Sequence, residues 1–205
     1  MYLHRLTTSG LISLALLAPL STAWAADPVG DVSIVKHDAN ARANGTSRAL
    51  AKTDPVNEGE ILSTGKDSRL EVALADGSTL TLGEAASLIL DDFTLNTDST
   101  SGALSVFTGA FLLVSGDKPH DGMTIHTPVA TIGIRGTTVW GGQIDGAFGV
   151  MVAEGSVSVT TDAGTVILDE PGEGTMVTSR TEAPEAPTAW SEDKKARAYA
   201  TVAIN

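Results

Sequence analysis

The stretch Thr127-Pro-Val-Ala-Thr-Ile-Gly-Ile-Arg-Gly-Thr137 places one long cation between two glycines in an otherwise apolar segment. Apolar residues alternate after the proline, which predicts an extended strand with one buried face formed by Ala130, Ile132 and Ile134. Gly133 and Gly136 permit a backbone geometry or a close approach that a side chain would block. We therefore expect Arg135 to point away from the apolar face.

Six residues of this stretch form a candidate binding or structural motif: Thr127, Pro128, Gly133, Arg135, Gly136 and Thr137. Two roles are open for the Arg135 guanidinium. As a structural group, it would bond to a carboxylate such as Glu154 and to backbone carbonyls, and so join neighbouring strands. As a functional group, it would bind an acidic ligand or partner. The structural role is the preferred interpretation.

A period of two dominates from Val29 to about Val177 and predicts many short, half-buried strands. The alternating apolar sets are Leu70, Val72 and Leu74; Leu80 and Leu82; Leu88 and Leu90; Phe148, Val150 and Val152; and Val157 and Val159. Turn signals separate these sets at Asn44-Gly45, Asp76-Gly77, Asp121-Gly122, Gly141-Gly142 and Asp162-Ala-Gly164. The predicted fold is therefore all-β.

Periodicity does not distinguish a sandwich, a barrel and a solenoid. Short apolar pairs after glycine corners and a low aromatic content favour stacked turns, with the bulky core candidates being Phe93, Phe107, Phe111, Trp140 and Phe148. We expect a twisted β-solenoid-like or sandwich-like domain of many short strands, followed by a short C-terminal helix.

The first residues are typical of a cleavable secretory signal. A weakly basic start precedes an apolar run over residues 11–20, and small residues alternate in Ala23-Trp-Ala25. That run is shorter than the roughly 18 residues that a membrane-spanning helix needs. We expect residues 1–25 to be removed and the mature protein to be periplasmic or secreted, with no transmembrane span.

The charge and the absence of cysteine exclude several classes of function. The whole chain has a formal net charge of −12, which disfavours binding to nucleic acid or to anionic membranes. With no cysteine, neither a disulfide nor cysteine catalysis is available. The expected organisation is an all-β domain over residues 27–178, a Pro-containing linker over 179–190, and a short helix or tail over 191–205. Ser191 would cap this helix, and its apolar face would carry Ala196, Tyr199, Ala200 and Ala203.

The opening motif resembles the T-P-x-A-x-x-G-x-R-G-T signature of the FecR family of bacterial envelope proteins. Further segments are similar to elements of that family. They are Glu60-Ile-Leu-Ser-Thr-Gly65, the strands from Leu70 to Leu82 around an Asp-Gly corner, Ser87 to Leu90, Gly109 to Val114, and Val152-Ala-Glu-Gly-Ser-Val157. Together they cover about Val29 to Val177. The resemblance implies a twisted, solenoid-like β module that makes protein contacts.

The best-known members of that family are membrane-spanning regulators that signal to a sigma factor. We expect this chain to be a stand-alone exported FecR domain instead, acting as a non-enzymatic interaction or scaffold module with a protein partner in the cell envelope. A signalling-related role is left open. The alternative is a small-ligand or carbohydrate-binding module with a weak metal site.

Candidate catalytic and metal-binding groups are sparse. His120 and His126 lie near Asp117 and Asp121, but their spacing is not diagnostic of a metal site. No serine lies in a G-x-S-x-G elbow. The pairs Asp91 with Asp92 and Glu170 with Glu173 read as solvated surface, and Gly141-Gly-Gln-Ile-Asp-Gly146 matches a calcium-binding turn only in part. We expect no catalytic residue, no cofactor and no metal.

Overall fold

The computed structural model describes residues 28–95, 100–116 and 120–204, and the side chains of residues 92–100 and 117–122 lie outside this description. The expected signal peptide, residues 1–25, also lies outside the described residues. The described chain forms one 16-stranded sheet and one helix of nine residues. The predicted all-β class is thus confirmed.

In chain order the elements are β1 (Pro28–Lys36), β2 (Ala39–Ala43), β3 (Thr46–Ala49), β4 (Pro55–Asn57), β5 (Ile61–Thr64), β6 (Arg69–Leu74), β7 (Thr79–Leu82), β8 (Ser87–Leu95), β9 (Thr100–Thr108), β10 (Phe111–Val114), β11 (His120–His126), β12 (Thr131–Ile144), β13 (Ala147–Thr161), β14 (Gly164–Leu168), β15 (Glu173–Val177), β16 (Thr188–Ala189) and α1 (Glu192–Ala200).

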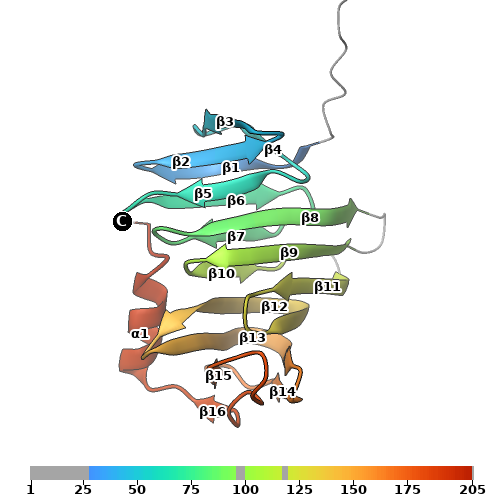
Figure 1. Cartoon of the computed structure of the whole chain (residues 1–205), viewed down its shortest axis with the longest axis vertical. Coiled ribbons are helices and arrows are strands. Elements are labelled where there is room, and N and C mark those ends of the chain that lie inside the picture. The colour runs from blue at the N-terminus through green and yellow to red at the C-terminus, as the bar shows by residue number, and fades with distance from the viewer. Residues whose placement is uncertain (1–27, 96–99, 117–119, 205) are drawn as a thin grey trace, which may run out of the picture.

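The sheet curls so that its strands lie in two layers (Figure 1). The front layer contains β3, β2, β5, β8, β9 and β11, in that order, and the back layer contains β4, β1, β6, β7 and β10. β9 and β11 pair in parallel, whereas the other described pairs are antiparallel. The fold is thus sandwich-like, although its two layers belong to one continuous sheet.

The long strands β12 and β13 connect the two layers. Residues 131–134 of β12 pair with β11 in the front layer, and residues 138–141 pair with β10 in the back layer. β13 follows the same course, pairing with β14 through residues 157–161 and with β15 through residues 148–151. A bend in this hairpin therefore closes the sandwich along one end.

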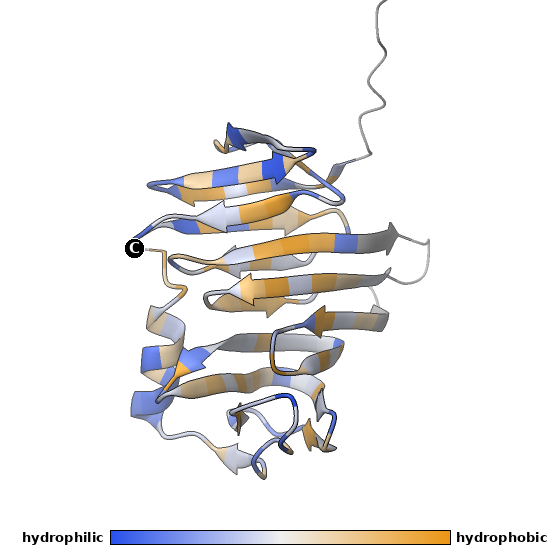
Figure 2. Cartoon of the chain, in the orientation of Figure 1, coloured by the Kyte–Doolittle hydropathy of each residue, from blue (hydrophilic) through white to orange (hydrophobic). Residues whose placement is uncertain are grey.

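Buried aliphatic residues from both layers form one core cluster. Figure 2 shows hydrophobic residues, in orange, on strands of both layers. All the alternating apolar sets predicted from the sequence are buried, as is Phe111. Phe107 was predicted for the core, but 48% of it is exposed, because its neighbours Leu104 and Val106 take the inward positions of β9. The side chain of Phe93 lies outside the described residues.

Two predicted turns are strand residues instead. Asp121-Gly122 lies within β11, and Gly141-Gly142 lies within β12. A Cβ on Gly141 would come 2.6 Å from the Phe111 ring, so this glycine allows close packing rather than a turn. The β12–β13 hairpin turns at Asp145 and Gly146, which both have positive φ.

A second, smaller cluster lies between β12 and the C-terminal segment. It consists of Ala110, Trp140, Ile144, Met151, Met176, Trp190, Ala198 and Val202. Trp140 is fully buried as expected, but it belongs to this second cluster and not to the main core. Its ring meets that of Trp190 edge-on, with the centroids 5.8 Å apart. Residues 179–190 return to the sheet, where β16 pairs with β15.

The C-terminal helix covers this second cluster. The Ser191 hydroxyl accepts a hydrogen bond from the Lys194 N–H, which confirms it as the N-cap. The predicted apolar face was wrong, because the buried residue of α1 is Ala198, followed by Val202 after the helix ends. Tyr199 lies 36% exposed at the rim.

Candidate functional site

The first motif residue, Thr127, holds the turn between β11 and β12. Its hydroxyl accepts a hydrogen bond from the backbone N–H of Ala130 at 2.9 Å and donates one to the Ala130 carbonyl at 2.9 Å. The Thr127 carbonyl accepts a bond from Arg180 Nη2 at 2.9 Å, which ties the segment after β15 to this turn. Pro128 is exposed at its tip. Thr127 therefore fixes where β12 begins.

The glycine of the R-G-T portion lies where β12 bends from one layer to the other. Gly136 has φ +57°, and Gly155 on the paired strand has φ +81°. The register between β12 and β13 shifts here, between Arg135 and Thr138. A Cβ on Gly155 would lie 2.2 Å from the Gly136 carbonyl oxygen. The two glycines thus allow a tight double bulge that side chains would prevent.

Thr137 is buried on the inner side of this corner, with 2% of its surface exposed. Its N–H donates to Ser115 Oγ at 3.0 Å, and its carbonyl accepts from the Ser115 N–H at 2.9 Å. Its own hydroxyl is buried and has no partner among the described residues. The backbone of Thr137 therefore anchors the corner to the end of β10.

Arg135 is placed differently from its neighbours. Its side chain is exposed and forms no hydrogen bond or ion pair with any described residue. The expected contact with Glu154 is not formed, because Glu154 lies opposite Thr138 beyond the bulge, whereas Arg135 lies opposite Ser156. Gly136 therefore shapes the backbone, whereas the Arg135 side chain has no bonding partner among the described residues.

A shallow depression of about 300 Å³ lies beside this arginine on the outer face of the front layer. It is lined by Met123, Thr124, Gly133, Ile134, Arg135, Ser156, Ser158 and Ile167. Gly133 has no side chain to fill it, and a Cβ there would meet Ser158 Oγ at 2.6 Å. Of the six motif residues, Gly133 and Arg135 are brought to this surface together, while the others build the turn and the corner.

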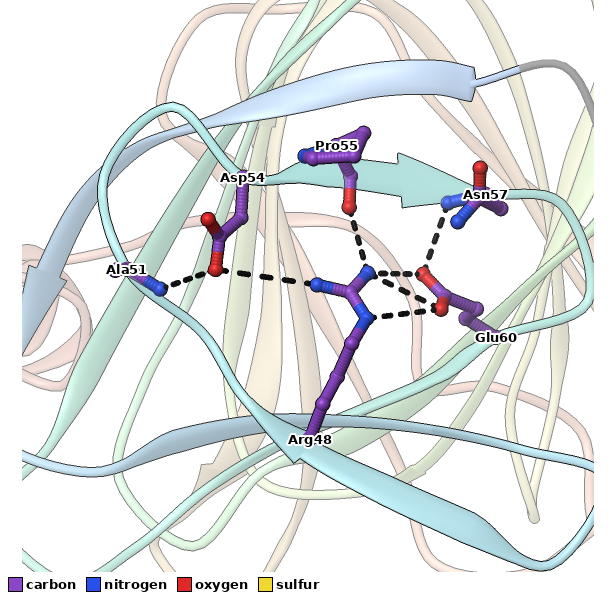
Figure 3. A network of polar contacts seen from close by, with 6 residues as sticks. All are labelled: Arg48, Ala51, Asp54, Pro55, Asn57 and Glu60. Carbon is purple, nitrogen blue, oxygen red and sulfur yellow. Dashed lines mark hydrogen bonds and ion pairs between the residues drawn. The ribbon is translucent and has the colours of Figure 1, made fainter. Parts of the chain in front are cut away.

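Sequence reasoning missed a second arginine, Arg48, on β3 at the other end of the sheet. Figure 3 shows its polar contacts. Arg48 Nη2 donates to Glu60 Oε2 at 2.8 Å and to the Pro55 carbonyl at 2.6 Å, and its Nε donates to Glu60 Oε1 at 3.3 Å. Glu60 Oε2 also accepts the Asn57 N–H at 2.9 Å, and Glu60 is buried. This network joins β3 to the loop between β4 and β5.

A third polar group fastens the C-terminal helix. Arg197 Nη1 donates to Asp145 Oδ1 at 2.6 Å, and Lys194 Nζ lies 3.5 Å from Asp145 Oδ2. The hydrogen bond from Arg197 lowers the pKa of the Asp145 carboxyl, with the charges of both cations adding to the effect and partial desolvation opposing it. Asp145, considered above as part of a calcium turn, is instead an ion-pair partner of α1.

The remaining candidate residues do not converge. Among the described residues no three histidine or acidic side chains form a group that would hold a metal ion. His126 is exposed, with Nδ1 3.3 Å from Thr131 Oγ1, and Glu173 accepts the Glu170 N–H at 3.2 Å. The side chains of His120, Asp92, Asp117 and Asp121 lie outside the description. No described helix is long and apolar enough to cross a membrane.

Comparisons with known proteins agree with this architecture. The family model described as FecR protein matches residues 60–158. Two crystal structures of a candidate anti-sigma factor from Parabacteroides distasonis ATCC 8503, at 1.65 and 2.50 Å resolution, each align with a TM-score of 0.53 and 18% identity. Each alignment covers 66% of this chain and 62% of that one, so this chain spans less than two thirds of those structures. A search of curated proteins found no match.

The matched region begins at Glu60, runs through the two layers and ends in β13, after the R-G-T corner. It therefore contains the turn held by Thr127, the glycine corner and the surface arginine, and the fold of the candidate anti-sigma factor is the same kind of curled sheet. Residues 60–158 of this chain therefore match the FecR family.

Proposed function

We propose that this chain is an exported, non-enzymatic protein-interaction or scaffold module of the bacterial envelope, with a signalling-related role. The observation that carries this proposal is the outer face of the front layer, which no helix covers in Figure 1. α1 packs against β12 and leaves that face open. The candidate anti-sigma factor with the same fold supports the signalling part.

The open face carries a row of mostly short polar side chains. One cross-strand row runs over β9, β11, β12, β13 and β14 through Ser105, His126, Thr131, Thr160 and Thr165. Hydroxyl groups on extended strands present both donors and acceptors to a partner without a large cost in side-chain entropy. Such a surface suits contact with a protein better than enclosure of a small molecule, which needs a concave site.

A photo-crosslinking amino acid placed on either layer tests the proposal in the native cells. Thr160 is exposed on the front layer, and Ala73 is exposed on β6 of the back layer, so they form a matched pair. We expect a discrete protein adduct from position 160 and none from position 73. Absence of an adduct from position 160, or the same set of adducts from both positions, would contradict the proposal.

Export is tested separately by fractionation of the same cells. The proposal expects the protein in the periplasm or the medium, with a mature N-terminus at Ala26. Recovery of the uncleaved chain in the cytoplasm would contradict the proposed export to the cell envelope.

A further inference from the structure

The depression beside Arg135 interrupts a row of outward-facing residues. Thr124, Gly133, Ser158 and Ile167 lie opposite one another on β11, β12, β13 and β14. Three of these positions carry side chains and Gly133 carries none, which leaves the gap of about 300 Å³. This volume is at the lower limit of small-molecule pockets, and the gap is open on one side, so it suits a single side chain better than a cofactor.

The polar side chains around the gap form no hydrogen bonds with described residues. The side chains of Arg135 and of Ser156 opposite it form no hydrogen bond with any described residue, and neither do the hydroxyls of Thr124 and Ser158. A guanidinium presents its donors in a planar fork that matches a carboxylate, and a hydroxyl can donate a further bond to the same oxygen atoms. The gap therefore offers several donors and one positive charge.

The charge at this place is opposite to that of the molecule. The chain has a formal net charge of −12, yet no aspartate or glutamate is among the residues that line the gap. An arginine that forms no ion pair with a described residue attracts a carboxylate more strongly than one already neutralised. The complementary ligand is an acidic side chain.

We infer that this gap binds the carboxylate of a glutamate or aspartate on an extended segment of a partner protein. The inference rests on the proposed interaction function and names the contact chemistry. A single exposed arginine binds a free anion only weakly, so the carboxylate has to be part of a larger contacting surface. Ile167, 50% exposed at the edge of the gap, gives the neighbouring residues of that segment an apolar contact.

Two capped peptides, acetyl-Thr-Val-Glu-Val-Thr-amide and its Gln counterpart, test the inference by NMR titration of the 15N-labelled protein. We expect the glutamate peptide to shift the Arg135 Nε–H signal and the Gly133 amide in a saturable manner. The glutamine peptide should bind about tenfold more weakly, which corresponds to about 1.4 kcal/mol, because it lacks the charge. Inorganic phosphate at the same concentration shows whether any anion suffices.

Two substitutions separate the charge from the space. Arg135→Gln removes the cation, and Gly133→Val fills the gap, where the Ser158 hydroxyl can rotate away from the new side chain. Each should reduce glutamate-peptide binding about tenfold, while Arg42→Gln, at an exposed arginine of β2 on the same layer, should not. Should Gly133→Val fail to fold, Arg135→Gln decides alone.

Equal binding of both peptides, binding of phosphate as tight as that of the glutamate peptide, or unchanged binding by Arg135→Gln would overturn the inference. The crosslinking test of the proposed function is independent of these titrations. An adduct at position 160 whose yield is unchanged by Arg135→Gln would reject the carboxylate site and leave the interaction function intact.

Discussion

Arg48 and Arg135 lie at opposite ends of the sandwich and have opposite environments. Arg48 is bonded to a buried carboxylate and to a backbone carbonyl, and it joins β3 to the loop that follows β4. Arg135 is exposed next to a gap and has no partner among the described residues. We therefore assign Arg48 a role in stability and Arg135 a role in recognition, within one continuous sheet.

The comparison also shows what stabilises each end. At the Arg48 end the stabilising groups are side chains that bridge separate strands. At the Arg135 end they are backbone groups, because Gly136 and Gly155 allow the bend and Thr137 is held by Ser115. At the corner, substitution of Gly136 or Gly155 should therefore lower the free energy of unfolding more than substitution of Arg135.

Gly155→Ala is expected to have the largest effect. A Cβ at this position would come 2.2 Å from the Gly136 carbonyl oxygen, on a backbone with φ +81°. Left-handed strain of about 1–2 kcal/mol and overpacking of about 1–3 kcal/mol together predict a loss of about 2–5 kcal/mol in the free energy of unfolding. Urea denaturation followed by tryptophan fluorescence measures it.

Gly146→Ala is the matched control for this prediction. Gly146 has φ +87°, yet no atom lies within 4 Å of the position that a Cβ would take there, so only the strain of about 1–2 kcal/mol applies. Equal losses at positions 155 and 146 would show that the close approach at the corner contributes nothing.

Arg48→Met should have the next largest effect. It leaves the Glu60 carboxylate with the Asn57 N–H but without its cation, and Glu60 is only 7% exposed. Loss of hydrogen bonds to a charged group predicts about 1.5–3 kcal/mol of lost stability. Arg42→Met, at an exposed arginine of the neighbouring strand, should change stability by less than about 0.5 kcal/mol. A loss no greater than that of the control would contradict the structural role of Arg48.

Acid should loosen the C-terminal helix before it unfolds the sheet. The pKa of Asp145 is lower in the folded chain than in the unfolded one, so its contribution is complete above the unfolded value of about 3.9 and is lost as the pH falls through the folded value. Fluorescence of Trp190, which packs under Lys194 at 4.2 Å, should therefore change below about pH 4. The same transition in Asp145→Asn would contradict this assignment.

The sequence was sufficient for the fold class and the family because both depend on local patterns. Alternating apolar residues on β6, β7, β8 and β13 predict strands whatever their partners, and the T-P to R-G-T segment is contiguous. It was insufficient wherever distant residues meet. Nothing near Arg48 indicates Glu60, twelve residues later. Gly141-Gly142 resembles a turn by its local sequence, because the Phe111 ring that packs against Gly141 comes from a different strand, β10.

Arg135 shows the same limit for the candidate site. Its position between two glycines drew attention to it, but Glu154, suggested as a carboxylate partner, lies opposite Thr138 beyond the double bulge at Gly136 and Gly155. A bulge shifts the register by a residue. Gly136 indicated an unusual backbone geometry, but the local sequence did not indicate the register of β12 against β13. The preferred structural role for this arginine therefore has no supporting contact among the described residues.

The free energy of unfolding of Arg135→Gln, measured by urea denaturation beside Arg48→Met, tests the central claim most directly. Since the Arg135 side chain forms no hydrogen bond or ion pair with a described residue, its substitution should leave stability within about 0.5 kcal/mol of the parent protein, while Arg48→Met loses about 1.5–3 kcal/mol. A loss for Arg135→Gln as large as that for Arg48→Met would contradict the division of the two arginines between recognition and stability.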